Sequence, residues 1–246
     1  MALPVIPANV RTIALVGIDG SGKTTQARRL AADLAAAGLP AVYRQNAGGR
    51  RWFGRLAERF GRRDAEDLIG RRAMLFAESL LRWLAIARTL LRRAARREIA
   101  VMDRYAVCQF ASLRARGARP AAERFARLAY RLLPRPDVTF LLTTDPAAAQ
   151  VRIDRRGYDH ETMEYLTSVT AAYRGLPEYP GFVVIDGNGS PDEVAAAIRA
   201  QLAALTRPVR QPAPRRRRLQ ARTVVLAGAP LVAGVAALGW QLAETF

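Results

Sequence analysis

The sequence predicts an α/β fold, in which a five-stranded parallel sheet with helices on both faces forms a three-layer sandwich that is followed by a C-terminal hydrophobic helix. Two observations support this prediction. Five short apolar runs recur along the chain, and stretches rich in alanine and leucine with helical spacing separate them. Because strands that alternate with helices are covered on both faces, a parallel sheet is favoured.

The predicted strands are brief runs of apolar residues, which suits strands that are buried on both faces. They comprise residues 12–16, 41–43, 99–102, 138–142 and 182–185. The stretches between them have helical spacing, and Pro191 suits the first turn of the last one. These predicted helices comprise residues 25–37, 65–97, 106–132, 146–156, 163–174 and 191–205. Residues 44–64 are rich in arginine and glycine, so we expect a loop over the site there.

The composition argues against several classes of protein. A single cysteine, Cys108, cannot form a disulfide framework within the chain and is typical of a reducing compartment. With one histidine and one cysteine, the sequence lacks the usual ligands of a zinc site. The N-terminus has no charged stretch followed by an apolar core, so we expect no secretory signal.

The chain carries a formal net charge of +18. Residues 1–206 hold 32 of the basic residues and 20 of the acidic ones, a surplus that suits an enzyme with polyanionic ligands. Such a surplus also suits nucleic acid. However, the sequence shows neither a recognised nucleic-acid motif nor aromatic residues interleaved with basic ones, so direct nucleic-acid binding is not the favoured interpretation.

The most specific pattern is a phosphate-binding loop. Residues 17–24 fit G-x-x-x-x-G-K-[ST] at every fixed position, with an apolar run before them and a helical stretch after them. Glycines at these positions let successive N–H groups form an anion-binding nest. Lys23, the only lysine of the chain, can reach the β- and γ-phosphates, and the Thr24 hydroxyl can bind Mg²⁺. An ordinary glycine-rich turn is the weaker interpretation.

Charged residues follow the third predicted strand. Ligands of open parallel sheets bind at the carboxyl ends of the strands, where Asp103 and Arg104 are expected to lie beside the phosphate-binding loop. An aspartate in that place can hold Mg²⁺ through water, and the arginine can bind a second phosphate group. A surface ion pair or a helix cap is the alternative for these two residues.

At this point the chain resembles the thymidylate kinase family of nucleoside monophosphate kinases, over about residues 10–205. Four blocks of sequence carry the resemblance: residues 17–25, the Asp103-Arg104-Tyr105 triplet, residues 145–157, and residues 184–194. The resemblance implies a P-loop NTPase fold, with residues 1–206 as the nucleotide kinase domain. It also implies ATP as donor, Mg²⁺ as cofactor, dTMP as the acceptor that is converted to dTDP, and a homodimer.

The resemblance also implies roles for individual residues. ATP would bind to the loop residues Gly17, Asp19, Gly20, Ser21, Gly22, Lys23, Thr24 and Thr25. The metal would be held by Thr24 and Asp103. The acceptor would be bound by Asp19, Arg44, Phe76, Arg104 and Tyr105, with Tyr105 crowding the 2′ position of the sugar. The catalytic residues would be Lys23, Asp103, Arg104 and the lid arginines Arg152, Arg155 and Arg156, which in an arginine-rich chain could instead form a solvated helix face.

The departures from the family pattern lie on the acceptor side. Leu80 stands where the family has an arginine, and Leu113 stands where it has an amide that would read thymine. Because each lost polar base contact can cost about 1–3 kcal/mol, discrimination between acceptors is expected to suffer. The alternatives are therefore a kinase of the same fold with a different phosphate-bearing or hydroxyl acceptor, or a membrane-tethered nucleotide-binding module without turnover.

The C-terminus is predicted to be a separate module. Residues 207–222 are rich in arginine and proline and are expected to form a disordered linker. Residues 223–246 then include an uncharged run, 224–242, that approaches the length of a transmembrane helix. The arginines before it would lie on the cytoplasmic side, which would anchor a cytoplasmic kinase domain to the inner face of the cell membrane. A peripheral lipid-binding segment and a docking helix for a partner are the alternatives.

Overall fold

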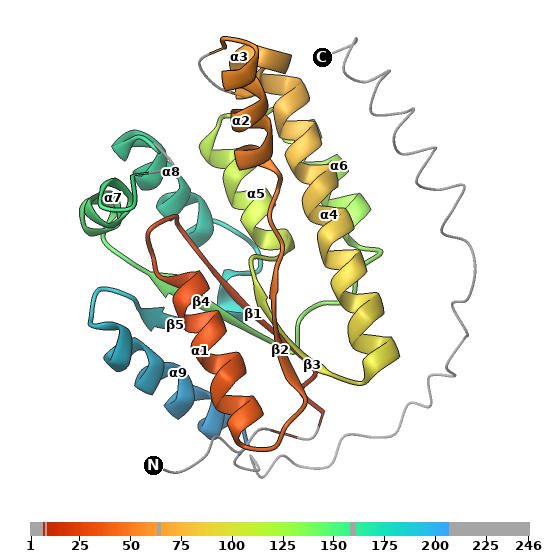
Figure 1. The fold of residues 1–246 in the computed structure, drawn as a ribbon, viewed down its shortest axis with the longest axis vertical. Helices are drawn as coiled ribbons and strands as arrows, with labels where there is room; N and C mark the ends of the chain where they lie inside the picture. Colours follow the sequence, from red (N-terminus) through yellow and green to blue (C-terminus); the bar gives the residue numbers. More distant parts are fainter. Residues whose placement is uncertain (1–6, 8, 63–64, 158–160, 207–246) are drawn as a thin grey trace.

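Five parallel strands run through the centre of this computed structural model, which describes residues 7, 9–62, 65–157 and 161–206. Their order in the sheet is β2-β3-β1-β4-β5 (Figure 1). The strands are β1 (Thr12–Gly17), β2 (Ala41–Gln45), β3 (Ile99–Asp103), β4 (Val138–Thr143) and β5 (Val183–Asp186). The predicted five-stranded parallel sheet is therefore confirmed.

Helices connect the strands and cover both faces of the sheet (Figure 1). They are α1 (Lys23–Ala36), α2 (Arg50–Arg59), α3 (Ala65–Ile69), α4 (Arg71–Arg96), α5 (Ala106–Ala115), α6 (Pro120–Tyr130), α7 (Pro146–Asp154), α8 (Met163–Arg174) and α9 (Pro191–Thr206). A short 3-10 helix, η1 (Tyr179–Gly181), leads into β5.

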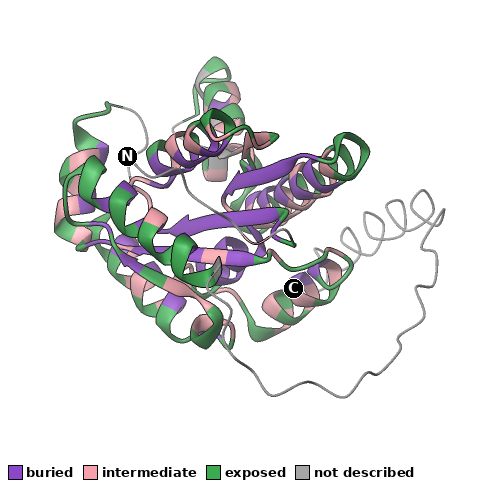
Figure 2. Cartoon of the chain, turned by 90° about the horizontal axis from the view of Figure 1, so that it is seen from below, coloured by how far each residue is buried: buried purple, intermediate pink, exposed green. Residues whose placement is uncertain are grey.

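The side chains of the central strands alternate between two buried clusters. Ala14 and Val16 of β1 contribute to a cluster with α4, α5, α6 and α8, whereas Ile13 and Leu15 contribute to one with α1 and α9. The strands are accordingly buried in the middle of the molecule, as Figure 2 shows. Because both faces are covered, the polar groups that follow the strands gather at their carboxyl ends.

Two predicted helices are interrupted at glycines. Gly70 has a φ of 82° and separates α3 from α4 within residues 65–97. Gly117, with a φ of 62°, separates α5 from α6 within residues 106–132, and Pro120 then begins α6. A residue with a positive φ cannot continue a right-handed helix, and both glycines were visible in the sequence.

The expected loop 44–64 contains a helix, α2, over ten residues. Its apolar side chains follow helical spacing, because Trp52 and Phe53 are followed by Leu56 and the fully buried Ala57. The many arginines of this segment belong to an amphipathic helix rather than to an irregular loop.

The predicted linker 207–222 and the predicted C-terminal helix 223–246 lie outside the described residues. Within the part of the chain that the structure describes, none of the helices is long and apolar enough to span a membrane.

Candidate functional site

The loop between β1 and α1 lies at the carboxyl end of the sheet, as the sequence predicted. Its backbone needs glycine at two places for different reasons. A Cβ on Gly17 would lie 2.5 Å from the carbonyl oxygen of Leu142 on the neighbouring strand β4. Gly20 has a φ of 82°, and a Cβ there would lie 2.9 Å from the Cα of Ala149 on α7. The loop is therefore fixed by close packing against β4 and α7.

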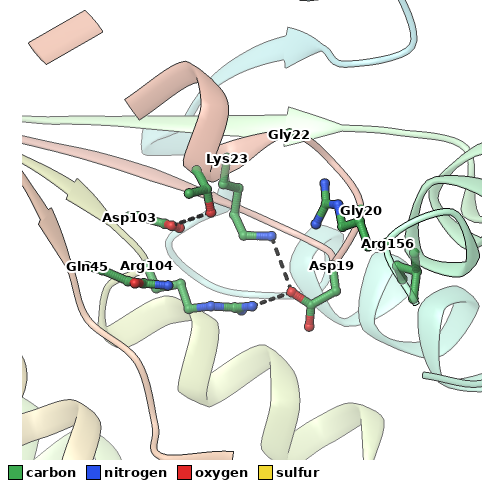
Figure 3. A pocket seen from close by; sticks show the side chains of 10 residues that line it. Asp19, Gly20, Gly22, Lys23, Gln45, Asp103, Arg104 and Arg156 are labelled. Carbon is green, nitrogen blue, oxygen red and sulfur yellow. Dashed lines mark hydrogen bonds and ion pairs between the residues drawn. The ribbon is translucent and has the colours of Figure 1, made fainter. Parts of the chain in front are cut away.

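Lys23 is the first residue of α1, and its side chain turns back into the loop. The ammonium donates to the carbonyl of Ile18, lies 3.5 Å from Ser21 Oγ and forms an ion pair with Asp19 Oδ1 at 3.7 Å. Burial and the charge of Arg104 lower the pKa of Lys23, although Asp19 partly opposes this shift. Figure 3 shows the ammonium pointing towards Asp19 of the phosphate-binding loop.

The structure fits a magnesium ion next to Thr24 and Asp103. Thr24 Oγ1 donates to Asp103 Oδ2 at 2.6 Å, and the hydroxyl of Tyr43 on β2 donates to the same oxygen at 3.2 Å. The second carboxylate oxygen, Oδ1, is buried and has no hydrogen-bond partner among the described residues. An unpaired buried carboxylate oxygen beside a phosphate-binding loop suits a water ligand of Mg²⁺.

Arg104 points from the end of β3 towards the loop. Its guanidinium forms an ion pair with Asp19, as Figure 3 shows. Burial alone would lower the pKa of Arg104, but the carboxylates of Asp19 and Asp103 raise it well above its usual value. Burial alone would raise the pKa of Asp19, but Arg104 and Lys23 lower it well below its usual value. Asp19 and Arg104 thus stabilise each other's ionised form within one cavity.

One cavity brings eight of the sixteen predicted site residues together (Figure 3). Its lining consists of Asp19, Gly20, Gly22, Lys23, Thr24, Gln45, Asp103, Arg104, Ile153 and Arg156. Of these, Gln45 and Ile153 were not predicted. The other predicted loop residues are Gly17, the buried Ser21 and the exposed Thr25, which share the loop but do not line this cavity.

The predicted lid arginines lie on and just after α7, and they have different surroundings. Arg156 lines the cavity, whereas Arg155 is exposed and is not among the lining residues. Arg152 donates to the carbonyls of Gly187 at 2.9 Å and Asn188 at 3.2 Å, so it connects α7 to the loop after β5. Their catalytic roles stay predictions.

Three predicted acceptor residues do not line the cavity. Arg44 forms an ion pair with the buried Glu98 at 2.5 Å. Tyr105 is buried, and its hydroxyl donates to the carbonyl of Pro134. Phe76 lies half-buried on α4. The roles of these residues in acceptor binding stay predictions.

A buried polar cluster on α4 and α5 was missed. Arg82 donates to Glu78 at 2.7 Å and to the amide oxygen of Gln109, while Gln109 Nε2 has no partner among the residues described. Gly48 covers this cluster so closely that a Cβ there would lie 3.1 Å from the Arg82 guanidinium. The sequence signal for this cluster was a pair of opposite charges four residues apart, Glu78 and Arg82, on the buried face of α4 that also holds Met74.

Comparisons with known proteins identify the family of this chain. The family model described as thymidylate kinase matches residues 15–198. A protein named as a probable thymidylate kinase from Pyrobaculum aerophilum is 30% identical over 188 residues, which cover 76% of this chain and 93% of that protein. The thymidylate kinase of Xanthomonas euvesicatoria pv. vesicatoria is 35% identical over 199 residues, and these cover 78% of this chain and 83% of that protein. The resemblance that the sequence motifs indicate is confirmed, and the chain belongs to the thymidylate kinase family.

Proposed function

We propose that this protein transfers the γ-phosphoryl group of ATP to dTMP and thereby produces ADP and dTDP. The observation that carries the proposal is the meeting of two phosphate-binding cations, Lys23 and Arg104, at Asp19 in one cavity. Phosphoryl transfer requires two phosphate groups to be aligned and their charge to be neutralised, and a pair of cations that meet at one carboxylate in one cavity suits this requirement.

The donor half of the site consists of the loop and the residues that contact it. The backbone N–H groups of the loop and Lys23 bind the β- and γ-phosphates. Thr24 and Asp103 would hold Mg²⁺, which would neutralise negative charge on the phosphate groups. Arg156 lines the same cavity from the end of α7, where it can stabilise the charge on the transferring group.

The acceptor half begins at Arg104. Its guanidinium can exchange the carboxylate of Asp19 for the phosphate of dTMP, with two donors for two phosphate oxygens. A phosphate oxygen of dTMP then attacks the γ-phosphorus, and the bond from that phosphorus to the bridging oxygen of ADP breaks. Asp19 is released from the ion pair in this exchange, and its carboxylate is free to accept a hydrogen bond from the sugar.

The base of the acceptor requires polar partners, which positions 80 and 113 do not supply. Arg82 has a buried guanidinium, and the side-chain amide nitrogen of Gln109 has no partner among the described residues. These residues supply an arginine and an amide, the groups expected at positions 80 and 113, from positions close to them in the sequence. This supports a nucleobase-bearing acceptor over a metabolite without a base, because a buried unpaired amide is costly until a ligand satisfies it.

The test is an acceptor panel with ATP and Mg²⁺, in which dTDP and ADP are both quantified. We expect the highest kcat/KM with dTMP, and a lower value with dUMP, dCMP, dAMP and dGMP. Equal formation of ADP and dTDP in wild-type protein, and neither in Lys23→Met, would support the proposal. Turnover of another monophosphate in preference to dTMP would contradict the assignment of the acceptor, and ATP binding without turnover would contradict kinase activity.

We also propose that residues 223–246 attach the kinase domain to the cytoplasmic face of the membrane. The sequence alone supports this proposal, through the uncharged run 224–242 and the arginines that precede it. Fractionation of cells that produce the full chain, compared with a chain that ends at residue 206, tests it. The full chain is expected in the membrane fraction, and its recovery in the soluble fraction would refute the proposal.

A homodimer is the oligomeric state that we propose. Leu81, Leu84 and Leu91 lie at helical spacing on α4, and they are 36%, 39% and 71% exposed. A stripe of exposed leucines on one helix suits a self-complementary interface. Light scattering is expected to give the mass of two chains for the wild type and of one chain for Leu84→Glu, whereas a monomeric wild type would contradict the dimer.

A further inference from the structure

We propose that Asn46 is a positioning residue that holds the backbone of Arg104 in a left-handed conformation and so aims its guanidinium into the cavity. Asn46 follows the end of β2, at the place where the register of the two strands pairs Gln45 with Asp103. The consequence for the acceptor phosphate rests on the proposed function, whereas the effect on the Arg104 backbone does not.

The backbone of Arg104 is strained. Its φ is 76°, a conformation that residues with a side chain rarely adopt. Keeping a residue other than glycine in this region costs free energy, so the surrounding structure must hold it there. Arg104 also carries the charge that faces Asp19, which places the strained backbone at the functional site.

Both peptide groups of Arg104 are held by hydrogen bonds. Its N–H donates to the carbonyl of Leu15 on β1 at 3.0 Å. Its carbonyl accepts from the side-chain amide of Asn46 at 2.9 Å, and the N–H of Asn46 donates to the carbonyl of Asp103 at 3.0 Å. Asn46 therefore holds the two peptide groups on either side of the Arg104 Cα.

The side chain of Asn46 is itself held in place. Asn46 is fully buried, and its amide oxygen accepts from the Thr89 hydroxyl of α4 at 3.2 Å. This hydrogen bond sets the orientation of the amide, because only its nitrogen can donate to the Arg104 carbonyl. Thr89 is itself 5% exposed, so water competes little for either group. Hydrogen bonds thus connect α4 through Asn46 to the backbone of Arg104 at the site.

Hydrogen exchange tests these hydrogen bonds without any substrate. Asn46→Asp keeps the size and the acceptor for Thr89 but removes the donor, and Thr89→Val is the milder change. We expect the protection of the Arg104 amide to fall about tenfold in Asn46→Asp and by less in Thr89→Val, since one buried hydrogen bond is lost or loosened. The control is the Ala100 amide, which bonds to Arg11 at the other end of β3. Unchanged protection at Arg104, or an equal loss at Ala100, would overturn the proposal.

Kinetics then test the effect on the guanidinium. In Asn46→Asp, the KM for dTMP is expected to rise about tenfold, as expected for a misaligned charged contact, while the KM for ATP stays within about twofold. In an Arg104→Gln background the same substitution is expected to add no further rise, because the two residues act through one contact. Additive effects, or equal rises in both KM values, would overturn the proposal. Absence of wild-type turnover with dTMP would refute the proposed acceptor alone, and hydrogen exchange would still decide the role of Asn46.

Discussion

The packing of the phosphate-binding loop against α7 yields a prediction about the stability of the unliganded protein. In Gly20→Ala, the new Cβ would overlap the backbone of Ala149, whose Cα lies 2.9 Å away, and the residue would keep a φ of 82°. The left-handed conformation costs about 1–2 kcal/mol for a residue with a Cβ. The overlap with a backbone that cannot rotate away adds about 1–3 kcal/mol. We therefore expect a loss of about 2–5 kcal/mol in the free energy of unfolding.

Gly38→Ala is the matched control, because Gly38 has a φ of 80° but its Cβ would meet nothing within 4 Å. It should lose only the conformational part, about 1–2 kcal/mol. Denaturant unfolding without nucleotide measures both values, and each kcal/mol corresponds to roughly 2–4 °C in Tm for a domain of this size. Equal losses in the two variants would refute the close packing of the loop against α7.

Three further predictions concern single side chains. Tyr43→Phe removes a hydrogen bond to Asp103, so the Mg²⁺ concentration for half-maximal activity is expected to rise by up to about tenfold. With Mn²⁺ as a paramagnetic substitute for Mg²⁺, an unchanged metal affinity in paramagnetic resonance would contradict this prediction. Arg44→Gln leaves the buried Glu98 without its counter-charge. Urea unfolding is therefore expected to show a loss of about 1–3 kcal/mol in the free energy of unfolding, and a loss near zero would contradict this prediction. Folding lowers the pKa of Asp19, so the ionised carboxylate stabilises the folded state. This stabilisation is complete above the unfolded pKa of about 4 and is lost as the pH falls below that value. Between about pH 5 and 2, the free energy of unfolding of Asp19→Asn should therefore fall less than that of the wild type. An equal fall in both proteins over this range would argue against the ion pair.

The sheet and the phosphate-binding loop could be predicted from the sequence because their signals are local. Each strand is an apolar run between helices, and the loop has fixed positions for Gly22, Lys23 and Thr24. The rule that ligands bind at the carboxyl ends of parallel strands also placed Asp103 and Arg104 correctly beside the loop.

The parts that could not be predicted depend on contacts between distant segments. Nothing local shows that Arg44 would turn to Glu98 or that Arg82 would be buried against Gln109. The first pair forms only when β2 lies beside β3, and the second forms only when α4 packs against α5. The role of Asn46 is similar, because its partners come from β3 and α4. The interruption of the helices at Gly70 and Gly117 was visible in the sequence, but the apolar periodicity on either side favoured a continuous helix.

The central claim is that one cavity aligns a nucleoside triphosphate on Lys23 with a nucleoside monophosphate on Arg104. The most direct measurement is single-turnover transfer from γ-labelled ATP to dTMP in the wild type, Lys23→Met and Arg104→Gln. We predict that label appears in dTDP with the wild type and that the rate falls by at least about 100-fold in each variant, as expected when a transition-state contact is removed. Transfer to dTMP that persists at the wild-type rate in either variant would contradict the account.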